Sequence, residues 1–196
     1  MDKKALLKNL NGKWLLGCTC GLKNEATQGV CGEGSHSATV VFIGEAPGKK
    51  EDELGRPFVG SAGKFLEEML ASINLKREEV YITNIVKYRP PNNRDPLPKE
   101  IADCSEWLTE EIKIIDPTLI VLLGRHAMHQ FFPDAKISEA HGVLVTSNYF
   151  GKTRNFLPLY HPAAALYNGA LREVLKEDFK RIPVMIKNLQ KGKVCR

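Results

Sequence analysis

The chain lacks long apolar stretches, an even set of cysteines and a large excess of one charge. Its longest stretch without a charged residue, from Asn155 to Leu171, is interrupted by two prolines, so no membrane span fits there. The N-terminus has neither the apolar region nor the cleavage site of a secretory signal, and we therefore expect a cytoplasmic protein. The five cysteines should be reduced, and their odd number argues against a disulfide framework.

What is present is typical of an ordinary globular protein. The 196 residues, 43% of them hydrophobic and 26% charged, exclude a disordered or fibrous chain and suit one domain spanning residues 1–196. The net charge of +5 is a hint of a nucleic-acid partner and no more, because solubility alone explains a charge of this size.

Four apolar segments predict buried strands, and amphipathic segments between them predict helices. The strands are predicted at Thr39–Ile43, Val80–Asn84, Leu119–Leu123 and Phe156–Tyr160, with a shorter apolar segment at Val143–Val145. The helices are predicted at Lys3–Leu16, at Ala62–Ile73 with Ser61 as N-cap, at Lys99–Ile115, after Gly124, and in a basic segment ending near Gly192. This alternation predicts an α/β fold, with three layers α/β/α around a central, mostly parallel four-stranded sheet.

The loops that follow the four strands should meet at the carboxyl edge of such a sheet, where ligands bind. They begin with Gly44-Glu-Ala-Pro-Gly48, Asn84, Gly124-Arg125 and His161-Pro162-Ala163. The first loop has the spacing of neither a dinucleotide fingerprint nor a Walker phosphate loop. It offers the carboxylate of Glu45 in a turn whose backbone can approach a ligand closely. We expect the other residues of this turn to bind substrate, namely Gly44, Ala46, Pro47 and Gly48.

Four motifs, in this order, resemble family 4 of the uracil-DNA glycosylase superfamily. They are GEAPGKKEDELGRPFVGSAGKFLEEML from Gly44, TNIVKYRPPNNRDPLP from Thr83, VLLGRHAM from Val121 and YHPAAAL from Tyr160. The resemblance extends from about Cys20 to the C-terminal helix. It implies a monofunctional DNA-repair hydrolase that flips uracil out of DNA and hydrolyses its N-glycosidic bond, leaving an abasic site.

The resemblance also implies roles for individual side chains. His161 would donate to uracil O2, where negative charge develops as the base leaves, and Asn84 would read the O4 and N3 edge with an amide that donates and accepts. Glu45 would orient water or stabilise the cation-like sugar, and Phe58 would stack on the flipped base. Asp52 is a second acidic candidate for substrate binding. Each side chain also has a structural alternative, which stays open. His161 could be a loop histidine bonded to backbone, Asn84 a turn cap and Phe58 a core residue. Glu45 and Asp52 could be loop carboxylates without a role in the reaction.

Contacts to DNA are expected from loop cations and from the segment after His161. The resemblance and the positions of the loops give these candidates: Lys49, Lys50, Lys87, Arg89, Arg94, Arg125, Pro162 and Ala163. Leu166 resembles the wedge that fills the gap left by a flipped base, with a core leucine as the alternative.

A [4Fe-4S] cluster is present in many members of the family, and this chain departs from their ligand pattern. Cys20 and Cys104 match, but Cys18 forms a C-x-C pair instead of C-x-x-C, and Tyr88 stands where relatives have a cysteine. Cys31 could supply the fourth thiolate, so Cys18, Cys20, Cys31 and Cys104 are the candidate ligands. The alternative is a variant without the cluster, in which Tyr88 fills the space; the reaction itself requires no cofactor.

Two other functions stay open at this stage. A non-catalytic module could bind uracil-containing or single-stranded DNA in the same pocket, and a small-molecule nucleobase hydrolase would prefer free deoxyuridine. His126, His129 and His141 lack the ligand spacing of a zinc site. We expect a monomer that acts on uracil-containing DNA and has no membrane partner. Whether a sliding clamp recruits it is open.

Overall fold

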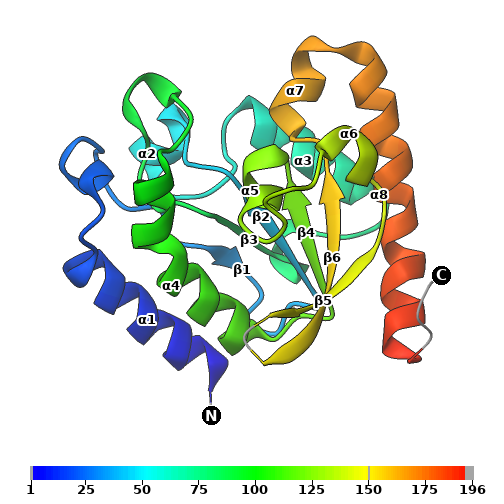
Figure 1. The fold of residues 1–196 in the computed structure, drawn as a ribbon, viewed down its shortest axis with the longest axis horizontal. Coiled ribbons are helices and arrows are strands. Elements are labelled where there is room, and N and C mark those ends of the chain that lie inside the picture. The colour runs from blue at the N-terminus through cyan, green and yellow to red at the C-terminus, as the bar shows by residue number, and fades with distance from the viewer. Residues whose placement is uncertain (1, 150, 193–196) are drawn as a thin grey trace.

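A six-stranded sheet forms the centre of the computed structural model, which describes residues 2–149 and 151–192. The strand order is β1-β3-β2-β4-β6-β5 (Figure 1). The strands are β1 (Glu33–Gly34), β2 (Val40–Gly44), β3 (Tyr81–Asn84), β4 (Leu119–Leu123), β5 (Val145–Tyr149) and β6 (Lys152–Leu159). The four central strands β3, β2, β4 and β6 are parallel, which confirms the predicted parallel core.

The sheet has six strands, so the predicted number of four is corrected. The additional strands are the two edges, and both run antiparallel to their neighbours: β1 pairs with β3, and β5 pairs with β6. Strand β1 has two residues, and β5 alternates between half-buried and exposed positions. Neither strand therefore has the continuous apolar run that marks a strand covered on both faces.

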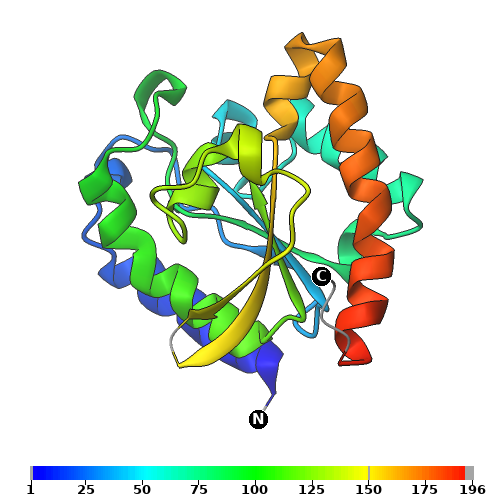
Figure 2. The ribbon, with the colours of Figure 1, turned by 45° about the vertical axis from the view of Figure 1, so that its right-hand side comes forward.

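Helices cover both faces of the sheet, as the predicted three-layer fold requires. One face carries α1 (Lys3–Gly17), α4 (Pro98–Ile115) and α5 (Arg125–His129), and the other carries α3 (Ser61–Ser72), α7 (Pro162–Tyr167) and α8 (Gly169–Gln190). Figures 1 and 2 show α1 beside α4 on one side and α8 on the other. The remaining helices are α2 (Lys49–Leu54), α6 (Ile137–Ala140) and the 3-10 turns η1 (Gly21–Asn24), η2 (Arg77–Glu79) and η3 (Pro91–Asn93).

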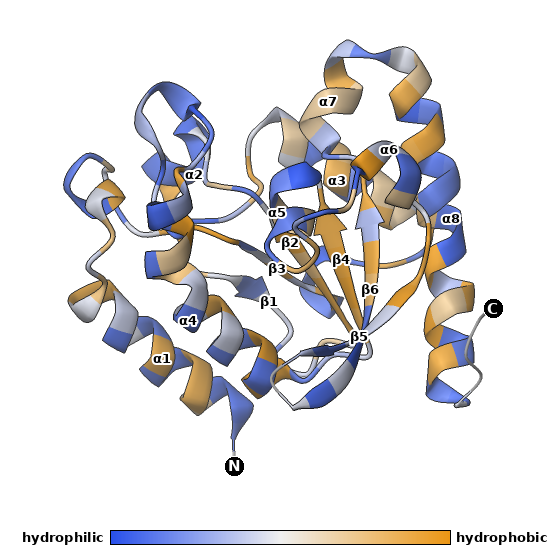
Figure 3. Cartoon of the chain, in the orientation of Figure 1, coloured by the Kyte–Doolittle hydropathy of each residue, from blue (hydrophilic) through white to orange (hydrophobic). Residues whose placement is uncertain are grey.

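Two apolar cores result from alternating side chains on the strands. In β2, Val41 and Ile43 pack under α1 and α4, whereas Val40 and Phe42 pack under α3 and α8. Figure 3 shows hydrophobic strands in the middle of the molecule and hydrophilic outer faces on α4 and α8. Among the helices that the structure describes, none is both long and apolar enough to cross a membrane.

Two short helices lie in segments that the sequence predicted as loops. Helix α2 interrupts the segment between Glu45 and Gly60, and α7 follows His161 directly. Gly60, not Ser61, is the N-cap of α3. Because the four central strands are parallel, the loops after β2, β3, β4 and β6 all lie at one edge of the sheet, together with α2 and α7.

Candidate active site

A cavity of about 280 Å³ opens at this edge between the loops after β2, β3 and β6. It is lined by Glu45, Ala46, Pro47, Gly48, Glu51, Phe58, Ala62, Pro90, Asn93, Arg94, His161 and Ala163. Several of these are sequence-predicted site residues, namely Glu45, Ala46, Pro47, Gly48, Phe58, Arg94, His161 and Ala163. The volume is near the lower end for small-molecule sites and suits a group of the size of one base.

The loop after β2 is fixed to the loop after β3 by backbone hydrogen bonds. The amide of Ile85 donates to the carbonyl of Gly44 at 3.0 Å, and that of Val86 donates to the carbonyl of Glu45 at 3.2 Å. Burial raises the pKa of the Glu45 carboxyl above its usual value, and His126 at 3.9 Å opposes this shift. The site therefore holds a partly desolvated carboxyl group on a rigid turn.

Phe58 and Asn84 converge over Gly44. A Cβ on Gly44 would lie 2.5 Å from Asn84 Oδ1 and 2.5 Å from Phe58 Cζ, so glycine is required for this close approach. The Asn84 side chain is 3% exposed, and its Oδ1 has no hydrogen-bond partner. Since a buried polar atom without a partner is costly, this oxygen is available to a ligand that donates to it.

His161 is held as a neutral imidazole with a defined tautomer. It is the N-cap of α7, and its Nδ1 accepts a hydrogen bond from the Ala163 amide at 3.1 Å. Burial lowers the pKa of His161 to about 4; the charge of Glu51 opposes this shift, and His126 adds a smaller contribution that lowers the pKa. With Nδ1 accepting, the proton is on Nε2, which is free to donate. The ring centroid lies 5.7 Å from that of Phe58.

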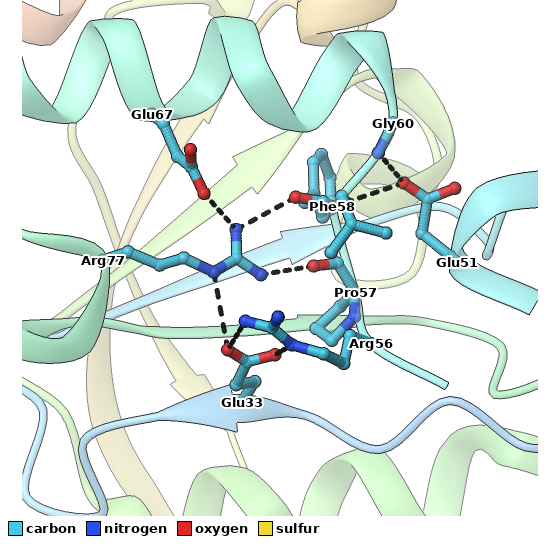
Figure 4. Close-up of polar contacts among 9 residues, drawn as sticks. Glu33, Glu51, Arg56, Pro57, Phe58, Gly60, Glu67 and Arg77 are labelled. Atoms are coloured by element: carbon cyan, nitrogen blue, oxygen red, sulfur yellow. Dashed lines mark hydrogen bonds and ion pairs between the residues drawn. The ribbon is translucent and has the colours of Figure 1, made fainter. Parts of the chain in front are cut away.

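Two residues without a sequence-predicted role hold the Phe58 loop from opposite sides (Figure 4). Glu51 accepts hydrogen bonds from the amides of Val59 at 2.8 Å and Gly60 at 2.7 Å. Arg77 donates to the carbonyls of Phe58, at 2.9 Å, and Pro57. Their residue types alone gave no signal, because both act on this loop through its backbone atoms.

A second cavity of about 270 Å³ shares Glu45, His161 and Ala163 with the first. Beside it, one ligand atom each from Glu45, Asp95 and His126 lie within 4.8 Å of one another. Arg125 already provides a cation here, because it donates to Asp95 Oδ2 at 2.8 Å and to His126 Nε2 at 3.0 Å. We therefore assign no metal to this group.

Three predicted ligand contacts need correction. Asp52 lies outside the cavity and is buried, because its carboxylate accepts hydrogen bonds from the Thr27 amide at 2.9 Å and the Thr27 hydroxyl at 2.7 Å. Lys87 is fully buried, with its ammonium group 2.5 Å from Glu111, and cannot reach DNA. Pro162 is buried as the first residue of α7. Asp52, Lys87 and Pro162 therefore have structural roles. Leu166 packs only partly buried against the core, and its role as a wedge stays a prediction.

The remaining predicted DNA contacts lie near the cavity. Lys49 is exposed at the start of α2, and the guanidinium of Arg89 donates to Asn93 at 2.7 Å. Arg125 pairs with Asp95, and Arg94 pairs with Glu100 at 2.6 Å. Ala163 lines the cavity itself. Phosphate binding by these residues stays a prediction.

The cysteine region does not fit the four-thiolate cluster that the resemblance implied. The phenol of Tyr88 is 2% exposed and its oxygen has no hydrogen-bond partner. Burial raises the pKa of Tyr88 to about 12, and the charges of Cys18, Cys104, Cys20 and Cys31 act in the same direction. A neutral phenol is therefore situated among the four candidate thiols, and it is a poor ligand for iron.

The thiols of Cys20 and Cys104 interact with each other, and Cys20 also contacts a backbone carbonyl. A hydrogen bond from Cys104 lowers the pKa of Cys20 to about 7, and Cys20 Sγ also lies 3.8 Å from the Glu100 carbonyl. The Trp14 ring packs edge-on against Tyr88, with centroids 5.7 Å apart. These contacts fill the space, so we derive no chemistry through a cluster.

Comparison with known proteins gives consistent matches. Residues 31–182 match the family model of the uracil DNA glycosylase superfamily. The chain is 48% identical over 168 residues to a type-4 uracil-DNA glycosylase of Archaeoglobus fulgidus, which covers 83% of this chain and 84% of the relative. It is 43% identical to a type-4 uracil-DNA glycosylase of Thermotoga maritima, covering 87% and 90%. It is also 33% identical to a segment of a DNA polymerase of Bacillus phage SP01, covering 76% of this chain and 15% of the polymerase.

Proposed function

The chain belongs to the uracil-DNA glycosylase superfamily and is a uracil-DNA glycosylase, and from this premise we propose how its own residues perform the reaction. Uracil in DNA is flipped into the cavity beside Phe58. The bond between uracil N1 and the sugar breaks with both electrons leaving on the base, and water adds to the sugar carbon. The products are an abasic site and free uracil, which takes up a proton.

The leaving base is stabilised by His161. Negative charge develops on uracil O2 as the bond breaks, and a donor fixed beforehand at that oxygen lowers the barrier. The Nε2–H of His161 is such a donor, because Nδ1 is already occupied by the Ala163 amide. The imidazole is neutral at physiological pH, since its pKa is about 4. It therefore stabilises the anion by a hydrogen bond without transferring its proton first.

Asn84 distinguishes uracil from cytosine. Uracil presents a donor at N3 and an acceptor at O4, and cytosine presents the opposite polarity at the same edge. The unpartnered Oδ1 of Asn84 accepts from N3–H, and its amide nitrogen donates to O4. Cytosine would leave this buried amide unpaired, which costs a few kcal/mol, more than shape can supply for two rings of equal size.

Phe58 and Glu45 act on different parts of the nucleotide, Phe58 on the base and Glu45 at the sugar. The Phe58 ring stacks on the flipped base, a contact worth about 1 to 3 kcal/mol. Glu45 lies across the same cavity and stabilises the cation-like sugar or orients the attacking water. Their positions at one cavity allow both effects on one nucleotide.

The DNA backbone is gripped around this cavity by Lys49, Arg89 and Arg125, and the turn at Ala163 contacts the strand. One catalytic domain spanning residues 1–196 works as a monomer. The cysteines Cys18, Cys20, Cys31 and Cys104 are free thiols, which agrees with a cytoplasmic location. The reaction uses no cofactor.

One observation carries the proposal: the Phe58 ring and the neutral His161 line one base-sized cavity, and the orphan oxygen of Asn84 lies beside the Phe58 ring at Gly44. The test is incubation with an oligonucleotide that contains one uracil, followed by alkali. We expect strand scission at the uracil and none in matched oligonucleotides with cytosine or thymine. Binding of uracil-DNA without scission would favour the non-catalytic module, and equal turnover of free deoxyuridine would favour a small-molecule hydrolase.

A further inference from the structure

The Phe58 backbone adopts a conformation that such a residue rarely takes. Its φ is +51°, in the left-handed region where a bulky side chain crowds the chain. The start of α3 leaves no room behind it, because a Cβ on Gly63 would lie 1.9 Å from the Phe58 carbonyl oxygen. A strained conformation of this kind persists only where surrounding groups fix it.

The Arg77 guanidinium contacts the two carbonyl groups at this point (Figure 4). It is bonded to Phe58 O at 2.9 Å and to Pro57 O, although it lies about 20 residues away on η2. Its side chain is 14% exposed. A planar guanidinium reaches two neighbouring acceptors at once with separate N–H groups in a fixed fork geometry, whereas a lysine ammonium is a point charge on a flexible stem.

Arg77 is itself held in place by two carboxylates. Its Nε lies 3.6 Å from Glu33 Oε1, and its Nη1 lies 3.4 Å from Glu67 Oε1. Glu33 on β1 also forms a two-pronged pair with Arg56, at 2.6 and 2.8 Å. The charge of Arg77 is thus balanced by groups on β1 and α3, so the guanidinium is available to the loop carbonyls in a fixed orientation.

We propose that Arg77 is a positioning residue for the reaction, which fixes the Phe58 loop so that the aromatic ring presents the flipped base to His161. This inference rests on the proposed function, in which Phe58 stacks on the base. Without the guanidinium, the left-handed turn relaxes and the ring leaves its place over Gly44. A displacement of about 1 Å at the reacting groups is enough to lower a rate by about a hundredfold.

A double-mutant cycle tests this role. The measurement is the single-turnover rate on a uracil oligonucleotide for the wild type, Arg77→Met, Phe58→Ala and the double variant, with folding followed by circular dichroism. Arg56→Met is the matched control, since Arg56 also pairs with Glu33 but bonds no carbonyl of the loop. We expect Arg77→Met to slow the reaction at least tenfold, Arg56→Met to change it less than twofold, and the Arg77 effect to shrink below twofold once Phe58 is absent.

Each result decides the question. A wild-type rate in Arg77→Met would overturn the inference, and so would a double variant whose loss is the product of the two single losses. In both cases, uracil release by the wild type would leave the proposed function intact. An inactive wild type would overturn both. If Arg77→Met does not fold, Arg77→Lys replaces it in the cycle: an intermediate loss that disappears without Phe58 supports the role, and an unchanged rate contradicts it.

Discussion

The substitution His161→Asn separates the two functions of this side chain. In the wild type, Nδ1 caps α7 through the Ala163 amide, and Nε2 is the donor proposed for uracil O2. Asparagine is a good N-cap, so it can keep the bond to the Ala163 amide, but its shorter side chain removes the donor from the position of Nε2. His161→Ala removes both.

The expected loss follows from the chemistry of the leaving group. One preorganised donor at a developing oxyanion is worth roughly 3 kcal/mol of barrier, or about a hundredfold in rate. Both variants should therefore lose about a hundredfold. His161→Ala should also be less stable than His161→Asn by about 1 kcal/mol, which is a difference of about 2–4 °C in melting temperature for a chain of this size.

The assay is the single-turnover rate on a uracil oligonucleotide, with melting by circular dichroism. His129→Asn is the control, because His129 is exposed and its Nε2 lies near the Ala135 carbonyl, away from the cavity. Since the pKa of His161 is about 4, the wild-type rate should show no imidazole titration between about pH 6 and about pH 8. A His161→Asn rate within threefold of the wild type would refute the assigned role.

Three other measurements test separate parts of the account. The pKa of His161 falls from 6.5 to about 4 on folding, so the unfolded chain binds a proton at this side chain at higher pH than the folded chain does. The wild type should therefore lose up to about 3 kcal/mol of its free energy of unfolding as the pH falls from about 6.5 to about 4. His161→Asn should lack this loss. Glu45→Gln should slow the reaction and abolish an acid limb whose midpoint lies above the ordinary glutamate pKa, and an unchanged pH–rate profile would speak against the carboxylate. Tyr167, 92% exposed at the end of α7, is a second candidate beside Leu166 for the group that fills the gap in the duplex. If Tyr167 has this role, Tyr167→Ala should slow cleavage of double-stranded DNA more than that of single-stranded DNA, and equal slowing would exclude the role.

A fourth test concerns Tyr88 and the cysteines. Freshly purified protein should be colourless, because a neutral phenol lies among the candidate thiols. The measurement is the visible absorption spectrum with an iron determination. A broad iron-sulfur band with stoichiometric iron would contradict the conclusion, drawn from Tyr88, that the cysteine region does not fit the cluster.

The parallel core and the family could be predicted because their signals are local. Continuous apolar runs mark strands covered on both faces, and β2 and β4 were found within one residue of their predicted bounds. The motifs identified the family because they combine loop residues that a core does not need. The edge strands β1 and β5 were missed or misplaced, since their pairing depends on β3 and β6 and not on their own composition.

The errors at the site arise from long-range partners that no local pattern reveals. Lys87 resembled a loop cation, but Glu111 lies 24 residues further along and pairs with it inside the core. Asp52 resembled a loop acid, but its carboxylate accepts a hydrogen bond from the backbone amide of Thr27, which lies 25 residues earlier in the chain. Helix α2 carries mostly charged residues and lacks an apolar period, so the sequence predicted a loop.

The central claim is that one cavity receives the extruded uracil between an aromatic ring, an amide and an imidazole. A crystal structure of the slow His161→Asn variant with a uracil oligonucleotide tests it most directly. The account predicts the base in the cavity of Glu45 and Phe58, with its N3 and O4 edge at Asn84 and its O2 toward residue 161. Uracil bound elsewhere, or in the cavity with this edge turned away from Asn84, would contradict it.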